Sequence, residues 1–74
     1  MQGVVGMKEI NQILAVTDRM GLSREWVEIP LGAQSPGKVS KLTNGKLQII
    51  VDADRPLEQF LGGLEAEIRR VMTG

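Results

Sequence analysis

Carboxylates and lysines are the side chains that could do chemistry here, because the sequence contains no cysteine and no histidine. General acid or base catalysis needs such a group held in a cleft, and covalent catalysis needs an activated nucleophile. The acidic candidates are Asp52, Asp54, Glu58, Glu65 and Glu67. Asp52 and Asp54 flank an expected strand-to-helix junction, where carboxylates accept hydrogen bonds from backbone N–H groups. We interpret this pair as capping residues rather than as a hard-cation site.

The composition sets further limits on function. Without cysteine or histidine, disulfides, thiolate zinc sites and imidazole metal sites are excluded. A chain of 74 residues has room for one hydrophobic core and little room for a pocket that excludes water. We therefore expect a single domain over residues 1–74 that has no catalytic residue, no metal site and no cofactor. Such a domain would act by binding.

The charge balance bears on the class of partner. Nine basic and nine acidic residues give a net charge of zero, whereas a generic nucleic-acid binder carries a basic excess. No apolar run approaches the roughly 20 residues that span a bilayer. The segment Met1–Met7 also lacks the features of a secretory signal. We expect a cytoplasmic protein that does not bind membranes, and the charge balance disfavours nucleic acid as its partner.

The first half of the chain predicts a helix followed by an edge strand. Residues 1–6 are read as a short strand at Val4 and Val5 or as a disordered lead-in. An apolar stripe then predicts a helix that ends with Gly21 in the left-handed position: Met7, Ile10, Ile13, Leu14, Thr17 and Met20. Trp26–Leu31 alternates like a strand. Because Pro30 cannot donate to a ladder, we expect this strand to lie at a sheet edge or to end there. Residues 32–37 are expected to form a flexible loop.

The dipeptide Asn44-Gly45 predicts a β-hairpin with a two-residue type I′ turn. That turn sets the pairing of the two strands. Leu42 would face Leu47, Ser40 would face Ile49, and Lys38 would face Val51, which places the apolar members on one sheet face. The opposite face would carry Lys41, Lys46 and Gln48, together with Val39 and Ile50.

A second helix completes the expected fold. Asp54 is its expected N-cap, and its apolar stripe is Leu57, Phe60, Leu61, Leu64, Ile68, Val71 and Met72. The predicted class is therefore α+β, in the order helix, strand, hairpin, helix. The three strands are expected to form an antiparallel sheet, with both helices covering one of its faces.

A helix-turn-helix is an alternative reading of residues 14–27, which run helix, Gly21, Leu22, Ser23 and a later Val27. Its recognition helix would have to continue through Pro30 and Gly32, which would break it about two turns too early for groove docking. We therefore prefer a helix, its C-cap and a strand.

Gly62 and Gly63 are an anomaly within the second helix, since each glycine costs roughly 1 kcal/mol relative to alanine. They are read as a point where a partner backbone approaches closely, or as a kink, a frayed segment or simple tolerance. Trp26 is read as an anchor for a partner or as a cap on the small core. Lys41 and Lys46 are read as solvated edge charges rather than as an anion site.

Three pieces of the chain resemble the front part of the ImmA/IrrE-type (zincin-like) zinc metallopeptidases. In that family a strand with Leu-Pro, a loop and a hairpin ending in Ile-Ile-Val-Asn/Asp precede a helix with a His-Glu-x-x-His motif. The matching pieces lie between Trp26 and Val71 and comprise Val27–Leu31, Asn44–Asp52 and Phe60–Ile68.

Carried over residue by residue, this resemblance places Glu65 on the catalytic glutamate and places Leu64 and Ile68 on the two zinc-binding histidines. Leucine and isoleucine cannot bind zinc. The resemblance therefore implies a metal-free relic in which sheet and helix pack as in that family, and it implies no activity.

We expect, in sum, a protein-interaction or self-associating module with an unknown protein partner or a second copy of itself. Its candidate surface residues are Trp26, Lys41, Lys46, Gly62 and Gly63. Two alternatives remain open. One is a metal-free, degenerate zincin-like protein, and the other is a nucleic-acid-binding accessory protein, which salt-dependent binding to DNA or RNA would reveal.

Overall fold

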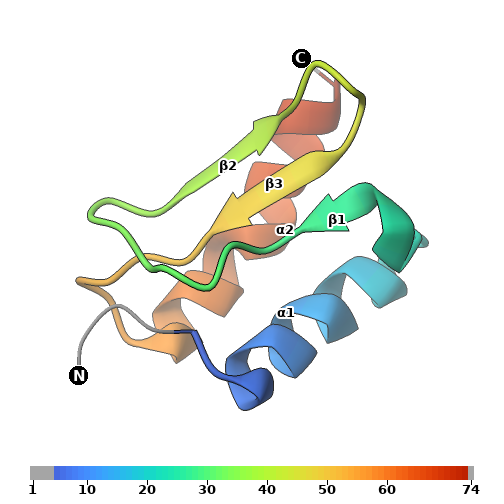
Figure 1. Cartoon of the computed structure of the whole chain (residues 1–74). Coiled ribbons are helices and arrows are strands. Elements are labelled where there is room, and N and C mark those ends of the chain that lie inside the picture. The colour runs from blue at the N-terminus through green and yellow to red at the C-terminus, as the bar shows by residue number, and fades with distance from the viewer. Residues whose placement is uncertain (1–4, 74) are drawn as a thin grey trace.

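Two helices and a three-stranded sheet make up the fold of this computed structural model, which describes residues 5–73 (Figure 1). Its elements are α1 (Met7–Arg19), the 3-10 helix η1 (Arg24–Trp26), β1 (Val27–Glu28), β2 (Lys38–Lys41), β3 (Leu47–Ile50) and α2 (Leu57–Thr73). The predicted α+β class is confirmed. The expectation for residues 1–4 lies outside the described residues, whereas Val5 is buried and its N–H donates to the carbonyl of Leu31 at 2.7 Å.

Helix α1 ends as its sequence predicts. Gly21 has a φ of 81°, in the left-handed region where side chains are disfavoured. The N–H of Gly21 donates to Asp18 at 3.0 Å, and the N–H of Leu22 donates to Thr17 at 2.9 Å. These two bonds form a Schellman motif, which satisfies the last carbonyls of the helix and turns the chain toward η1.

The sheet is mixed, and the prediction of an all-antiparallel sheet was wrong. Its strand order is β1-β3-β2, with β2 antiparallel and β1 parallel to β3. The most apolar strand, β3, takes the centre, where both of its edges are paired. β1 contains only Val27 and Glu28 of the six residues expected. It lies at a sheet edge, where a nearby Pro30 with no N–H to donate is tolerated.

The hairpin turn also differs from the prediction. Gly45, with a φ of 89°, is the only residue of the turn with a positive φ, whereas a type I′ turn would need two. The N–H of Gly45 donates to Leu42 at 2.9 Å, and the N–H of Leu42 donates to Lys46 at 2.7 Å. The loop therefore has three residues and ends in a glycine bulge, which is the next most common hairpin connection.

That extra loop residue changes the pairing by one position. Val39 is paired with Ile49, and Lys41 is paired with Leu47. Because successive strand side chains alternate between faces, a shift of one residue reverses the faces of β2. The predicted placement of Val39 and Lys41 on the outer face was wrong, and both lie on the face that carries the buried side chain of Leu47.

The connection between residues 32 and 37 is attached to the sheet through Gln34. Its N–H donates to the carbonyl of Val51 and its carbonyl accepts from the N–H of Ala53, both at 2.9 Å. Gln34 and Asp52 form a parallel bridge. The connection thus resumes the parallel pairing that β1 begins, and it brings Gly37 next to Asp52.

Helix α2 starts later than predicted. Its first residue is Leu57, and the N–H of Phe60 donates to the carbonyl of Pro56 at 3.1 Å. Pro56 therefore occupies the position just before the helix, which the prediction gave to Asp54. Asp54 instead belongs to the preceding turn, where its N–H donates to Oδ1 of Asp52 at 2.8 Å.

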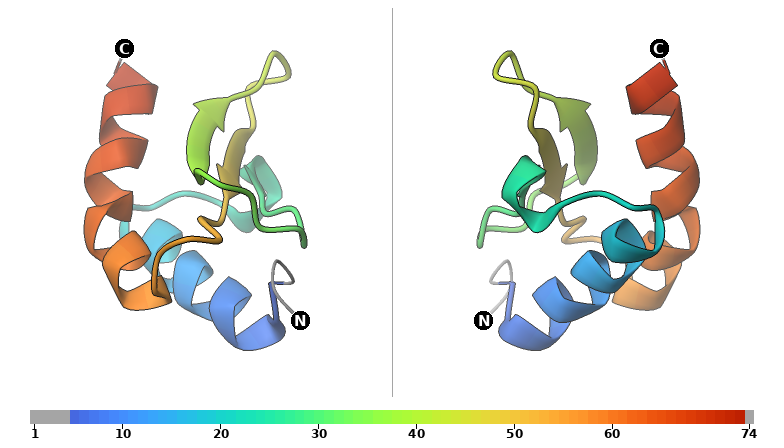
Figure 2. Two further views of the ribbon diagram at one scale, coloured as in Figure 1. Left: turned by 90° about the vertical axis from the view of Figure 1, so that its left-hand side faces the viewer. Right: turned by 90° about the vertical axis from the view of Figure 1, so that its right-hand side faces the viewer.

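The core lies between the sheet and the two helices. Figure 2 shows α2 alongside one face of the sheet and α1 crossing below both. The buried apolar residues are Val5, Ile13, Val16, Leu47, Ile49, Val51, Phe60, Leu64 and Ile68. Met7, which the sequence placed on the apolar stripe of α1, is exposed instead. Over residues 5–73, neither helix has the length and apolar character needed to cross a membrane.

Candidate functional site

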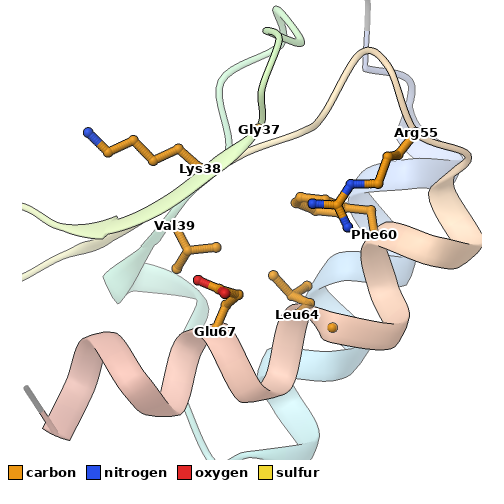
Figure 3. A pocket seen from close by; sticks show the side chains of 8 residues that line it. Gly37, Lys38, Val39, Arg55, Phe60, Leu64 and Glu67 are labelled. Carbon is orange, nitrogen blue, oxygen red and sulfur yellow. The ribbon is translucent and has the colours of Figure 1, made fainter.

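A groove of about 200 Å³ opens between strand β2 and helix α2 (Figure 3). It is lined by Gly37, Lys38, Val39, Arg55, Phe60, Gly63, Leu64 and Glu67. Val39, Phe60 and Leu64 provide an apolar floor, and Arg55 and Glu67 provide charge. The side chain of Lys38 points away from the groove (Figure 3). Small-molecule sites usually measure about 300–1,000 Å³. A groove of this size therefore suits one or two side chains better than a cofactor.

The helical wall of the groove follows from the spacing of residues on α2. Phe60, Gly63, Leu64 and Glu67 recur at intervals of three and four residues, which places them on one side of a helix. A Cβ atom built on Gly63 would meet no atom within 4 Å. Because residue 63 has no side chain, the groove is open on the side of α2 at this position.

The strand wall is an edge of the sheet, because β2 is the last strand in the order. Leu42 and Lys46 form a hydrogen-bonded pair, and such pairs alternate with non-hydrogen-bonded ones in an antiparallel ladder. The backbone groups of Ser40 therefore point toward β3, whereas those of Val39 and Lys41 point away from the sheet. Among the described residues, neither has a backbone hydrogen bond on that side. The edge therefore offers two N–H groups and two carbonyls to a ligand.

Asp52 organises one end of the groove. Its side chain is only 5% exposed, Oδ1 accepts from the N–H of Asp54 at 2.8 Å, and Oδ2 accepts from Nε of Arg55 at 3.1 Å. The N–H of Asp54, above all, lowers the pKa of Asp52. The N–H of Gly37 and the guanidinium of Arg55 act in the same direction, against the effect of burial. Asp52 is a positioning residue that holds Arg55 beside the groove.

We expect the stability of the protein to fall in acid as Asp52 becomes protonated. A carboxyl whose pKa is lower in the folded state stabilises the fold above its unfolded pKa of about 3.9, and this contribution disappears as the pH falls through the lower folded value. The Asp52→Asn variant should be less stable than wild type at neutral pH and should lose less stability between about pH 5 and pH 2. Urea unfolding followed by circular dichroism would measure this. Equal pH dependence in the two proteins would contradict it.

The candidate surface residues predicted from sequence do not form one patch. Gly63 lines the groove, and Lys41 lies on β2, the strand that forms its other wall. Gly62 is exposed on α2 but does not line the groove, and α2 continues through both glycines without interruption. Trp26 is 53% exposed, and Cζ3 of its ring lies 3.8 Å from the position of a Cβ on Gly45, beside the hairpin turn. Lys46 follows that turn.

Sequence reasoning missed most of the groove because it assigned the wrong hairpin turn. With a two-residue turn, Val39 belonged to the outer face and could not meet α2. The three-residue turn places Val39 on the inner face, opposite Phe60 and Leu64 (Figure 3). The signal that could have corrected this was the apolar character of Val39 on a strand whose other residues, Lys38, Ser40 and Lys41, are polar or charged.

The residues singled out by the zincin-like resemblance lie as follows. Leu64 is 1% exposed and Ile68 is fully buried in the core. Glu65 faces α1 rather than the groove, with ion pairs to Arg19 at 3.7 Å and to Arg69 at 2.5 Å. Both arginines are exposed, so these pairs contribute little to stability.

Comparison with known proteins gives no relatives: no family model matches the chain, and no curated protein or solved structure is significantly similar to it. Within residues 5–73, no three acidic side chains gather where they could hold a metal ion.

Proposed function

We propose that this protein is a protein-interaction module that binds an extended segment of a partner in the groove between β2 and α2. One observation carries the proposal. The backbone groups of Val39 and Lys41 point outward along an open, apolar-floored groove. Added strands gain affinity from such backbone groups and specificity from pockets that take alternate side chains. The open space at Gly63, which has no side chain, leaves room for one of the ligand's side chains.

The proposal is tested by filling the groove without disturbing the fold. A leucine at position 63 would begin in open space and would improve the helix propensity of α2, so the Gly63→Leu variant should remain folded. Peptides selected from a random display library on the wild-type protein should bind this variant at least about 10-fold more weakly, because its side chain occupies the groove.

The chain offers a matched control at the neighbouring residue. Gly62→Leu makes the same chemical change on the same helix, and its Cβ also meets nothing within 4 Å, but Gly62 does not line the groove. The selected peptides should bind Gly62→Leu as tightly as wild type. Peptides that bind all three proteins equally, or a library that yields no binder, would refute the proposal.

A further inference from the structure

The charge around the groove is unbalanced although the whole chain is neutral. Lys38 and Lys41 lie on β2, and among residues 5–73 neither forms an ion pair. Glu67 is the acidic side chain of the groove, and Arg70 already pairs with it. The edge that a ligand would pair with is therefore positively charged, and it would attract an acidic ligand.

Arg55 adds to this positive charge at the end of the groove near Lys38. Asp52 compensates its charge in part, but contacts the guanidinium only through Nε. Its terminal nitrogens, which carry four more N–H donors, form no hydrogen bond within the part of the chain that the structure describes. They lie on the α2 side of the sheet, where they can bind a carboxylate of the ligand at this end of the groove.

A second copy of this chain fits the edge poorly. Pairing β2 with β2 of another molecule around a two-fold axis would bring two copies of Lys38 and two of Lys41 into one four-residue ladder. Like charges across a ladder are destabilising, and lysine on an edge strand is a common device against such pairing. The occupant of this edge is expected to be a different molecule.

We infer that the ligand is an extended acidic peptide with one apolar anchor, an assignment that rests on the proposed function. In antiparallel pairing its residue opposite Val39 points to the side of α2, onto Phe60 and Leu64 and past Gly63. Its residues opposite Lys38 and Lys41 are acidic. From N- to C-terminus the motif is acidic, polar, apolar, acidic, with the polar residue opposite Ser40.

Single-stranded nucleic acid is the other extended anion that could meet this surface. Such ligands bind largely by stacking bases on exposed aromatic rings. The aromatic residue of the groove, Phe60, is 7% exposed, and Trp26 lies beside the hairpin turn and outside the groove. The outward N–H and carbonyl groups of Val39 and Lys41 match the alternating groups of a peptide backbone. The groove therefore favours a peptide.

The test uses short capped peptides with a central Glu-Thr-Leu-Glu, compared with versions that carry lysine for both glutamates or serine for the leucine. Titration of isotope-labelled protein followed by NMR should show binding of the first peptide, with the largest shifts at the amides of Val39, Lys41 and Gly63. Both altered peptides should bind at least about 10-fold more weakly. Raising the salt concentration should weaken binding of the acidic peptide.

Charge reversal provides the decisive variant. The double substitution Lys38→Glu and Lys41→Glu should favour the lysine peptide over the acidic one while leaving the circular dichroism spectrum unchanged, because both residues are exposed. Equal binding of acidic and lysine peptides to wild type would overturn the assignment. So would tighter binding of oligothymidylate, or a dimer in sedimentation equilibrium that Gly63→Leu dissociates.

Failure of this assignment can be told apart from failure of the proposed function. If library-selected peptides lose affinity for Gly63→Leu but are neutral or basic, the groove binds peptides and the acidic motif is wrong. If the selected peptides are insensitive to Gly63→Leu, the proposed function itself is wrong.

Discussion

The Gly37→Ala substitution is expected to lower the free energy of unfolding by about 3 kcal/mol. A Cβ atom on Gly37 would lie 2.6 Å from the backbone N of Asp52, and 2.7 Å from both its Cα and the carbonyl oxygen of Ile50. All three are backbone atoms of the segment that leaves β3, so no side chain can rotate to relieve the clash. Either the entry to β2 or the exit from β3 must shift.

A loss of that size is large for this chain. At about 0.05–0.15 kcal/mol per residue, a domain of 74 residues has a total stability of about 4–11 kcal/mol. Urea unfolding followed by circular dichroism would show a lower midpoint, or a chain that is partly unfolded without urea. A midpoint within error of wild type would show that residue 37 and Asp52 do not approach each other as described.

Gly62→Ala is the matched control, because the same methyl group should have the opposite effect there. The added Cβ would meet no atom within 4 Å, and position 62 is exposed in the interior of helix α2. Alanine stabilises such a position by about 1 kcal/mol relative to glycine. If the same change lowers the free energy of unfolding at Gly37 and raises it at Gly62, the fold requires glycine at the first position and only tolerates it at the second.

The elements that sequence predicted well are those whose signals are local. The end of α1 depends on Gly21 and its neighbours, so the sequence alone contains the information for the Schellman motif. The end of β1 before Pro30, at a sheet edge, likewise agrees with the prediction made from that proline. The parallel pairing of β1 with β3 depends on the path of the chain after Pro30, and no local sequence pattern predicts that path.

The hairpin shows how a small local error affects the functional site. Asn44-Gly45 fits both a two-residue turn and the last two residues of a three-residue turn, and the structure uses the second. This difference of one residue placed Val39 on the wrong sheet face in the prediction, so the groove was not predicted. Gly37 was missed for another reason, since its need to be glycine arises from Asp52, which lies fifteen positions away in the chain.

The Ile49→Ala substitution is the second change with a large expected effect. Ile49 is 0% exposed, lies on the central strand and belongs to the core between the sheet and the helices. Replacing a buried isoleucine with alanine lowers the free energy of unfolding by about 2–5 kcal/mol. Apolar contacts are lost, and the deleted atoms leave a cavity that the neighbours fill only partly. The variant is therefore expected to be close to the limit of stability. Ile49→Val should cost about 1 kcal/mol and keep the effect measurable.

Ile50→Ala is the control that makes this a test of the sheet faces. Ile50 is half-buried, and it is paired with Lys38 on the opposite face of the sheet. Its truncation should cost clearly less than that of Ile49, because the side chain of Ile50 buries less apolar surface when the protein folds. Urea midpoints of the three variants would give this order. Equal losses at both positions would mean that the second face is also covered in solution, and the open face of the sheet would then be an interface.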